Sequence, residues 1–131
     1  MSFLTEVTGF VERASEALNK TATEVEIEVM TLVIIRSPVD KGRFRGNWQT
    51  SVGSAVTGEI DRLGAQPSIE EMQSVVRDLK GGRVSFISNN LPYGHRLEFE
   101  GWSDQAPHGM VRRTVSEYQK IVQNAARKNR I

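Results

Sequence analysis

The side chains that most often carry out catalysis or bind metal ions are sparse in this chain. His95 and His108 are the only histidines, and there is no cysteine. A hydrolytic triad needs a histidine beside a serine and a carboxylate, but no nucleophile motif such as Gly-x-Ser-x-Gly occurs. Glu98, Glu100 and Asp104 carry the oxygen ligands of hard metal ions, yet their spacing matches no known ligand pattern and is typical of a solvated loop edge. We therefore expect no enzyme activity, no metal site and no cofactor.

A second kind of chemistry is suggested by segment 37–48, which reads SPVDKGRFRGNW and alternates basic with aromatic residues. Lys41, Arg43 and Arg45, with Phe44 and Trp48 interleaved, could bind either a phosphate backbone or the acidic edge of another protein. The alternative is a solvated turn with a buried tryptophan. Exposed aromatic side chains are costly unless something covers them, so we predict a binding surface here.

Trp102 raises the same question in the loop 101–105, whose sequence is GWSDQ. Two separate aromatic loops with charged neighbours favour protein interfaces, where Trp, Tyr and Arg often dominate the binding energy. Burial is again the alternative explanation.

The composition is that of one ordinary soluble domain. The 131 residues are 38% hydrophobic and 25% charged, which predicts a single domain spanning 1–131. No run of about 18 apolar residues is present, so no membrane span is expected. The N-terminus lacks the pattern of a secretory signal, which predicts that the protein stays in the cytoplasm of the cell that makes it.

Opposite charges gather at the two ends of the chain. Residues 1–35 hold six glutamates and two basic residues, a net charge of −4, whereas residues 110–131 hold six basic residues and one glutamate, a net charge of +5. One interpretation is that the terminal helices lie side by side within one molecule and neutralise each other. The other is that the acidic element of one copy faces the basic element of the next, which favours head-to-tail rings.

The elements that must position these residues begin with a long amphipathic helix, predicted from about Thr5 to Arg36 and ended by Pro38. At 1.5 Å per residue it would run roughly 45 Å, longer than a domain of this size needs for its own core, so we expect part of it to pack on a neighbour. Its apolar stripe consists of Val7, Val11, Ala14, Leu18, Val25, Val29 and Leu32.

The rest of the chain is mixed. Alternation predicts strands at 48–52 and 83–88, separated by a long loop or hairpin extension at 53–67 and a short helix. Loops of that length usually have a function or become ordered only against a partner. Ser68 to Glu71 form a capping box that would open the helix, and Gly81-Gly82 would end it.

A helical turn is predicted at 95–100, with Pro92 at a first helical position, and a last helix opens at Ala106-Pro107. The buried stripe of that last helix is predicted to be Met110, Val111, Thr114, Val115, Tyr118, Ile121, Val122 and Ala125. The predicted class is α+β: a long N-terminal helix and a C-terminal helix packed on a small, mainly antiparallel sheet, with a short middle helix and a long loop.

The order of these pieces resembles the tail-completion, or neck, proteins of long-tailed bacteriophages, a family that includes the minor tail protein Z of lambda. The similarity rests on the long helix running into SPVDKGRFRGNW, then on residues 87–93 (ISNNLPY), Leu97-Glu98-Phe99 and Gly101, and residues 105–111 (QAPHGMV) before the last helix. It spans roughly residues 5 to 125. In the family, a helix is followed by a Pro-Val-Asp-Thr-Gly turn, strands, a Tyr-containing segment, an Ala-Pro turn and a helix.

The resemblance implies a structural virion protein without catalytic activity, made in the host cytoplasm and located in the tail neck. It would form a homo-oligomeric ring of roughly six copies around a channel through which genomic DNA passes without sequence specificity. Its partners would be the tail-terminator and tail-tube proteins and the head connector or head-completion protein. The interface or channel candidates are Lys41, Arg43, Phe44, Arg45, Trp48, Tyr93, Trp102, Arg112 and Arg113.

Two alternatives remain at this point. One is the tail-terminator protein that caps the tail tube, which has a related fold. The other, from a different class, is a small DNA-binding protein that uses Lys41, Arg43, Arg45 and the basic C-terminal helix. A DNA-binding protein should bind duplex DNA tightly and with a steep dependence on salt, whereas a structural ring should bind it weakly.

Overall fold

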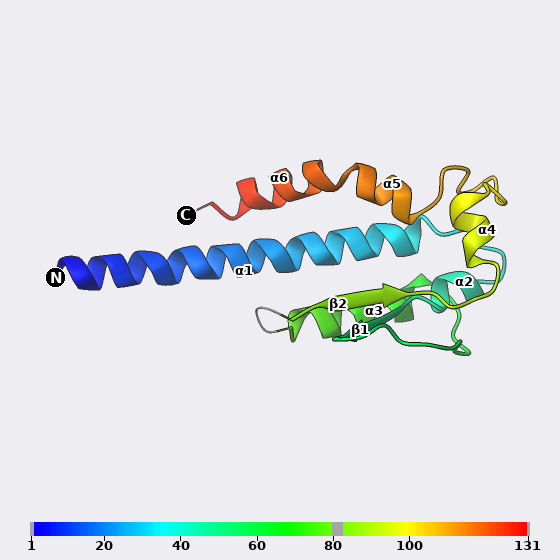
Figure 1. Cartoon of the computed structure of the whole chain (residues 1–131), viewed down its shortest axis with the longest axis horizontal. Coiled ribbons are helices and arrows are strands. Elements are labelled where there is room, and N and C mark those ends of the chain that lie inside the picture. The colour runs from blue at the N-terminus through cyan, green and yellow to red at the C-terminus, as the bar shows by residue number, and fades with distance from the viewer. Residues whose placement is uncertain (1, 80–82, 131) are drawn as a thin grey trace.

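A single helix, α1 (Phe3–Ile35), runs along most of the molecule in the computed structural model, and the other elements lie along or beyond its C-terminal part (Figure 1). The structure describes residues 2–79 and 83–130. On one side of α1 lie α5 (Val111–Ser116) and α6 (Tyr118–Lys128), and on the other lie α3 (Ala65–Arg77) and the strands β1 (Gln49–Val52) and β2 (Ser85–Ser88). The short helices α2 (Arg43–Gly46) and α4 (Gly94–Phe99) cluster near the end of α1. The predicted α+β class is confirmed.

The ends of α1 follow local chemistry. The Ser2 hydroxyl accepts a hydrogen bond from the Thr5 amide at 3.2 Å, and Glu6 in the first turn is favourable at the positive end of the helix dipole. Arg36 is the C-cap residue and lies two positions before Pro38, which cannot continue a helix. The predicted helix is therefore confirmed to within two residues at each end.

The sheet has two antiparallel strands, in which Gln49 pairs with Ser88 and Val52 with Ser85. Both strands are shorter than predicted, at four residues each. Three apolar clusters hold the elements together. The largest lies at the C-terminal end of α1, and the others join α1 to α6 and α1 to α3. The largest comprises Val33, Ile34, Phe44, Trp48, Leu91, Leu97, Ala106 and Met110.

The prediction that a capping box at Ser68 opens the middle helix is wrong. Helix α3 begins at Ala65, directly after Gly64, and Pro67 occupies its first turn, where the missing amide proton costs no helical hydrogen bond. The Ser68 hydroxyl is buried and donates to the Arg45 carbonyl at 2.7 Å, so a tertiary contact takes the place of the cap. Helix α3 ends at Arg77, and the predicted stop at 81–82 lies outside the described residues.

The C-terminal helix also differs from its prediction, because it is two helices that meet at Glu117. Residues 106 and 107 precede the helix, and α5 starts only at Val111. The predicted stripe divides accordingly. Thr114, Ile121 and Ala125 are buried, whereas Val111, Val115 and Tyr118 are exposed.

The helical turn predicted at 95–100 is confirmed as α4, although Pro92 lies before the helix rather than at its first position. The long segment after β1 is anchored within the chain rather than extending as a hairpin. The Ile60 amide donates to Asn47 Oδ1 at 3.0 Å, and the side chains of Gln49 and Asn90 both donate to the Gly58 carbonyl at 3.0 Å. These contacts order the loop without a partner.

No helix within residues 2–79 and 83–130 is both long enough and apolar enough to cross a bilayer.

Candidate interaction surfaces

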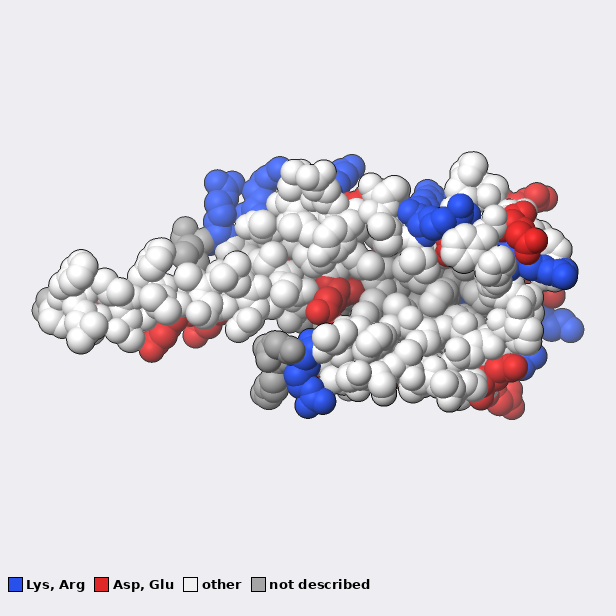
Figure 2. Space-filling model, viewed as in Figure 1, with Lys and Arg blue, Asp and Glu red and all other residues white. Residues whose placement is uncertain are grey.

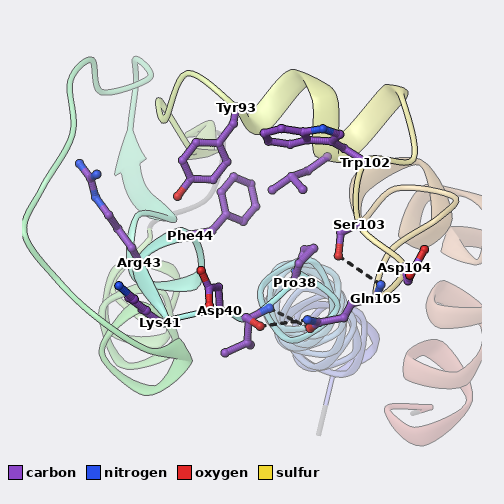
Figure 3. Close-up of a pocket in the computed structure, with 12 residues that line it drawn as sticks. Pro38, Asp40, Lys41, Arg43, Phe44, Tyr93, Trp102, Ser103, Asp104 and Gln105 are labelled. Carbon is purple, nitrogen blue, oxygen red and sulfur yellow. Dashed lines mark hydrogen bonds between the residues drawn. The ribbon is translucent and has the colours of Figure 1, made fainter.

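An open pocket of about 720 Å³ lies between the turn 38–43, helix α4 and the loop 102–105 (Figure 3). We call it the aromatic pocket. It brings together candidates from three separate parts of the sequence, namely Lys41, Arg43, Phe44, Tyr93 and Trp102. The remaining candidates, Arg45, Trp48, Arg112 and Arg113, do not line it.

Three rings form a continuous series from the core to the surface of this pocket. Phe44 lies 5.7 Å from Tyr93, and Tyr93 lies 6.5 Å from Trp102, measured between ring centroids. Phe44 is 6% exposed and Trp102 is 58% exposed. The exposed tryptophan is thus supported from below by rings that belong to the core.

The prediction that Phe44 and Trp48 present a binding surface is wrong, because both are core residues with 6% of their surface exposed. Trp48 packs edge-on against Phe44 at 5.8 Å, and its indole nitrogen donates to the Ser37 hydroxyl at 2.8 Å. The buried-tryptophan alternative therefore holds for Trp48. For Trp102 the expected exposure is confirmed.

The loop that carries Trp102 is fixed to the turn opposite. The Gln105 side chain accepts from the Val39 amide at 2.8 Å and donates to the Val39 carbonyl at 2.9 Å, as the dashed lines in Figure 3 show. The Arg96 guanidinium lies 5.2 Å from the centre of the Trp102 ring, a cation–π distance. Trp102 is exposed but held in position, which lowers the entropy cost of binding a partner.

The basic residues of the turn are largely engaged within the chain. Arg45 donates to the carbonyls of Ser37 and Ile35 at 2.8 and 2.7 Å, so its charge lies at the negative end of α1. Arg43 forms an ion pair with Glu59 at 2.6 Å. Arg45 is consequently engaged with the backbone of its own chain, and of the three only Lys41 makes neither an ion pair nor a side-chain hydrogen bond within the described part of the chain.

Glu98 is a structural residue that sequence reasoning assigned to a solvated edge. It is 7% exposed, and its carboxylate accepts from the amides of Met110, Val111 and Arg112 at 3.1, 2.7 and 3.2 Å. The carboxylate thereby caps helix α5 from a distant part of the sequence. The sequence did contain an indication of this role, because the N-cap position of α5 is Met110, whose side chain cannot cap a helix.

Arg112 completes this arrangement, because its Nε lies 3.1 Å from Glu98 Oε2 and its Nη2 also donates to the Glu98 carbonyl. Burial acts to raise the pKa of Glu98, but the amide hydrogen bonds from Val111, Arg112 and Met110 and the Arg112 guanidinium outweigh it, and the pKa is lowered. Gly109 allows the close approach, since it has a φ of +84° and a Cβ there would collide with Glu98 Oε2. Arg112 therefore stabilises the fold, as Arg45 does.

Arg113 lies exposed on α5, away from the aromatic pocket. Close to it, Arg36 Nη2 donates to Glu117 at 2.6 Å, and Arg36 Nη1 donates to the Thr114 hydroxyl at 3.2 Å. The hydrogen bond from Arg36, together with the charges of Arg36, Arg113 and Lys120, lowers the pKa of Glu117. This ion pair fastens the junction of α5 and α6 to the end of α1.

The oppositely charged terminal helices do lie side by side, as one of the two interpretations required (Figure 1). Their contact is apolar, however, and consists mainly of Val25 on α1 against Ile121 and Ala125 on α6. Among the described residues, no cation of α6 lies within 4 Å of a glutamate of α1. Basic side chains instead line the outer edge of α6, and acidic ones the opposite side of α1 (Figure 2).

The first part of α1, residues 3–20, projects beyond every other described element, and we call it the N-terminal arm (Figures 1 and 2). Its large apolar side chains are between 40% and 81% exposed. They are Phe3, Leu4, Val7, Phe10, Val11 and Leu18. The predicted surplus of helix length is thus present, and the arm has no cover within the described chain.

Comparison with known proteins adds no relative: no family model, no curated protein and no solved structure matches the chain significantly.

Proposed function

We propose that this protein is a structural subunit of a bacteriophage neck, a tail-completion protein whose copies form a ring that joins the tail to the head connector. The sequence supports this through the order of motifs that it shares with tail-completion proteins. The structure supports it through the N-terminal arm, which is the observation that carries the proposal. A helix that leaves its apolar face uncovered in one copy is suited to a subunit whose neighbours complete it.

The magnitude of the uncovered surface is considerable. Covering what remains exposed of a large apolar side chain is worth roughly 1 to 2 kcal/mol. Covering the six exposed apolar side chains of the N-terminal arm would therefore contribute on the order of 10 kcal/mol to association. Association costs on the order of 4 to 15 kcal/mol, so the arm needs additional contacts to hold a complex together. A closed ring provides them, because each copy has two neighbours.

The aromatic pocket supplies a second surface, at the opposite end of the molecule from the arm (Figures 1 and 3). An exposed, immobilised tryptophan beside a tyrosine and an arginine is typical of the residues that dominate protein interfaces. We assign this surface to the non-identical partners, the tail proteins on one side or the head connector on the other. The contacts between copies in the ring are then made by α1 and the helices beside it.

The DNA-binding alternative is less well supported. Of the three cations of the turn on which it relied, two are engaged, Arg45 with carbonyl groups and Arg43 with Glu59. The basic residues of the C-terminal helix, on which it also relied, are exposed. We expect the isolated protein to bind duplex DNA weakly and with little sequence preference, so that DNA passes through the ring without being held. Tight binding with a steep dependence on salt, measured by fluorescence anisotropy, would favour the alternative.

The experiment that tests the proposal is cryo-microscopy of tailed particles assembled with this protein. A ring of this chain between the tail tube and the head connector supports the tail-completion assignment. A ring that caps free tails but is separated from the connector by another protein would indicate a tail terminator instead. Complete particles in which the chain is absent from the neck would overturn the proposal.

A further inference from the structure

Helix α1 carries one apolar row along its whole length, with residues seven positions apart at Leu4, Val11, Leu18, Val25 and Leu32. This spacing is that of the seam of a coiled coil. In the C-terminal half of α1 the row is covered, because Val25 and Leu32 pack against α6. In the arm it is open, with Leu4, Val11 and Leu18 being 74%, 54% and 70% exposed.

The point at which the cover stops is well defined. Helix α6 ends at Lys128, and the side chain of the next residue, Asn129, donates to Glu24 at 2.8 Å. Beyond Glu24 toward the N-terminus, no described element lies on the row (Figure 1). The arm therefore continues an interface that already binds one helix, and a second helix with an apolar face would suit it.

The same chain has an apolar helical face of that kind. Val111, Val115 and Tyr118 follow one another at spacings of four and three residues and are all exposed, although Thr114 among them and Ile121 after them are buried. We call these three residues the α5–α6 face. It cannot cover the arm of its own molecule, because α5 lies beside the other end of α1 (Figure 1).

The charges of the two surfaces are complementary. On the arm, Glu6, Glu12 and Glu16 outnumber Arg13 and Lys20. Around the α5–α6 face, three basic residues accompany one glutamate, and that glutamate is already paired with Arg36. The basic residues are Arg112, which is itself paired with Glu98, and Arg113 and Lys120, which have no ion pair within the described residues. Pairing two arms with each other would instead bring like charge together and leave the α5–α6 face uncovered.

The two surfaces differ in length. The α5–α6 face spans eight residues, roughly 12 Å of helix, whereas the arm comprises about 18 residues, roughly 27 Å. The face would therefore cover about half of an arm laid along it.

From these observations we infer that the N-terminal arm of one copy packs along the α5–α6 face of a second copy. The inference rests on the ring in the proposed function and names the surfaces that form it. Because the two surfaces differ, the contact is head-to-tail, so it repeats from copy to copy until the assembly closes or grows as a filament.

Disulfide trapping tests this contact, since the chain has no cysteine of its own. The variants Val7→Cys, Val11→Cys and Leu18→Cys are each mixed with Val115→Cys under mild oxidation. We expect a linked pair containing one copy of each variant, resolved by mass spectrometry. Glu16→Cys is the matched control, because it lies on the polar side of the arm and should link to Val115→Cys at least about tenfold less.

Every result bears on the inference. Circular dichroism should first show that each variant retains the helicity of the unsubstituted protein, as expected for exposed positions. A dominant link between two copies of Val11→Cys would mean that arms pair with arms, and it would overturn the inference. An oligomer in which neither link forms would also overturn it, while leaving the ring intact. A single-copy mass of the unsubstituted protein would contradict both the inference and the proposed ring.

Discussion

Replacing Glu98 tests how the fold positions helix α5. In Glu98→Gln the side chain keeps its shape but loses its charge. One oxygen can still accept from Met110 and Val111, whereas the amide group that replaces Oε2 faces the donors of Arg112. Losing about half of a charged hydrogen-bond network at a buried site should lower the free energy of unfolding by about 3 kcal/mol. For a chain of this size that corresponds to a fall in Tm of about 10 °C.

The pH dependence makes the prediction sharper. Because the pKa of Glu98 is lowered in the folded protein, its stabilising effect is fully present above the pKa of the unfolded chain, about 4.3. It is lost as the pH falls through the lower pKa of the folded state. The difference in unfolding free energy between the unsubstituted protein and Glu98→Gln should therefore be constant from about pH 8 to pH 5.5 and should shrink below about pH 4.3.

The assay is urea unfolding followed by circular dichroism at several pH values. Glu100→Gln is the matched control, since Glu100 is exposed and the nearest basic nitrogens, on His95 and Arg96, lie at 3.9 and 4.0 Å. It should change the free energy of unfolding by less than about 0.5 kcal/mol. If Glu98→Gln is as mild as its control, or if its effect does not change at low pH, the account of Glu98 as the cap of α5 is refuted.

Three further predictions follow from the same contacts. Arg45→Ala should lower the free energy of unfolding by about 2 kcal/mol, because it leaves two carbonyls at the end of α1 unpaired. Arg43→Ala removes only an exposed ion pair and should lower it by less than about 1 kcal/mol. Equal losses in urea unfolding would contradict this prediction. Gly109→Ala should lower the free energy of unfolding by about 2 to 4 kcal/mol in the same assay, since the φ of Gly109 is positive and the added Cβ would meet Glu98. Gly9→Ala, in an exposed part of α1, should instead raise it by up to about 1 kcal/mol. Trp102→Ala should leave the monomer within about 1.5 kcal/mol of its normal stability while producing unjoined heads and tails in electron micrographs; normal infectious particles would count against the aromatic pocket as an interface.

The sequence predicted those features that local periodicity and chain-breaking residues control. In this way the length of α1, its end before Pro38, the presence of two strands and the turn at α4 could be predicted. Each depends on residues a few positions apart, for which spacing and backbone preference are sufficient. The exposure of Trp102 was predictable for a similar reason, since its loop offers no apolar neighbours in sequence.

The errors concern contacts between distant parts of the chain. Phe44 and Trp48 looked like exposed loop residues, but a single helical turn after Gly42, which has a φ of +83°, directs them into the core. The start of α5 is determined by Glu98, which precedes the helix by more than a turn and belongs to another element. A single apolar stripe could not show that the chain changes direction at Glu117, and that change leaves part of the stripe exposed.

The most direct test of the central claim, that copies of this chain complete one another in a neck ring, is a cryo-microscopy reconstruction of assembled tailed particles. The account predicts a closed ring of this protein at the junction of tail and head, with each N-terminal arm resting on its neighbour. A reconstruction that places the protein there as isolated single copies, or that shows a complete junction built without it, would contradict the account.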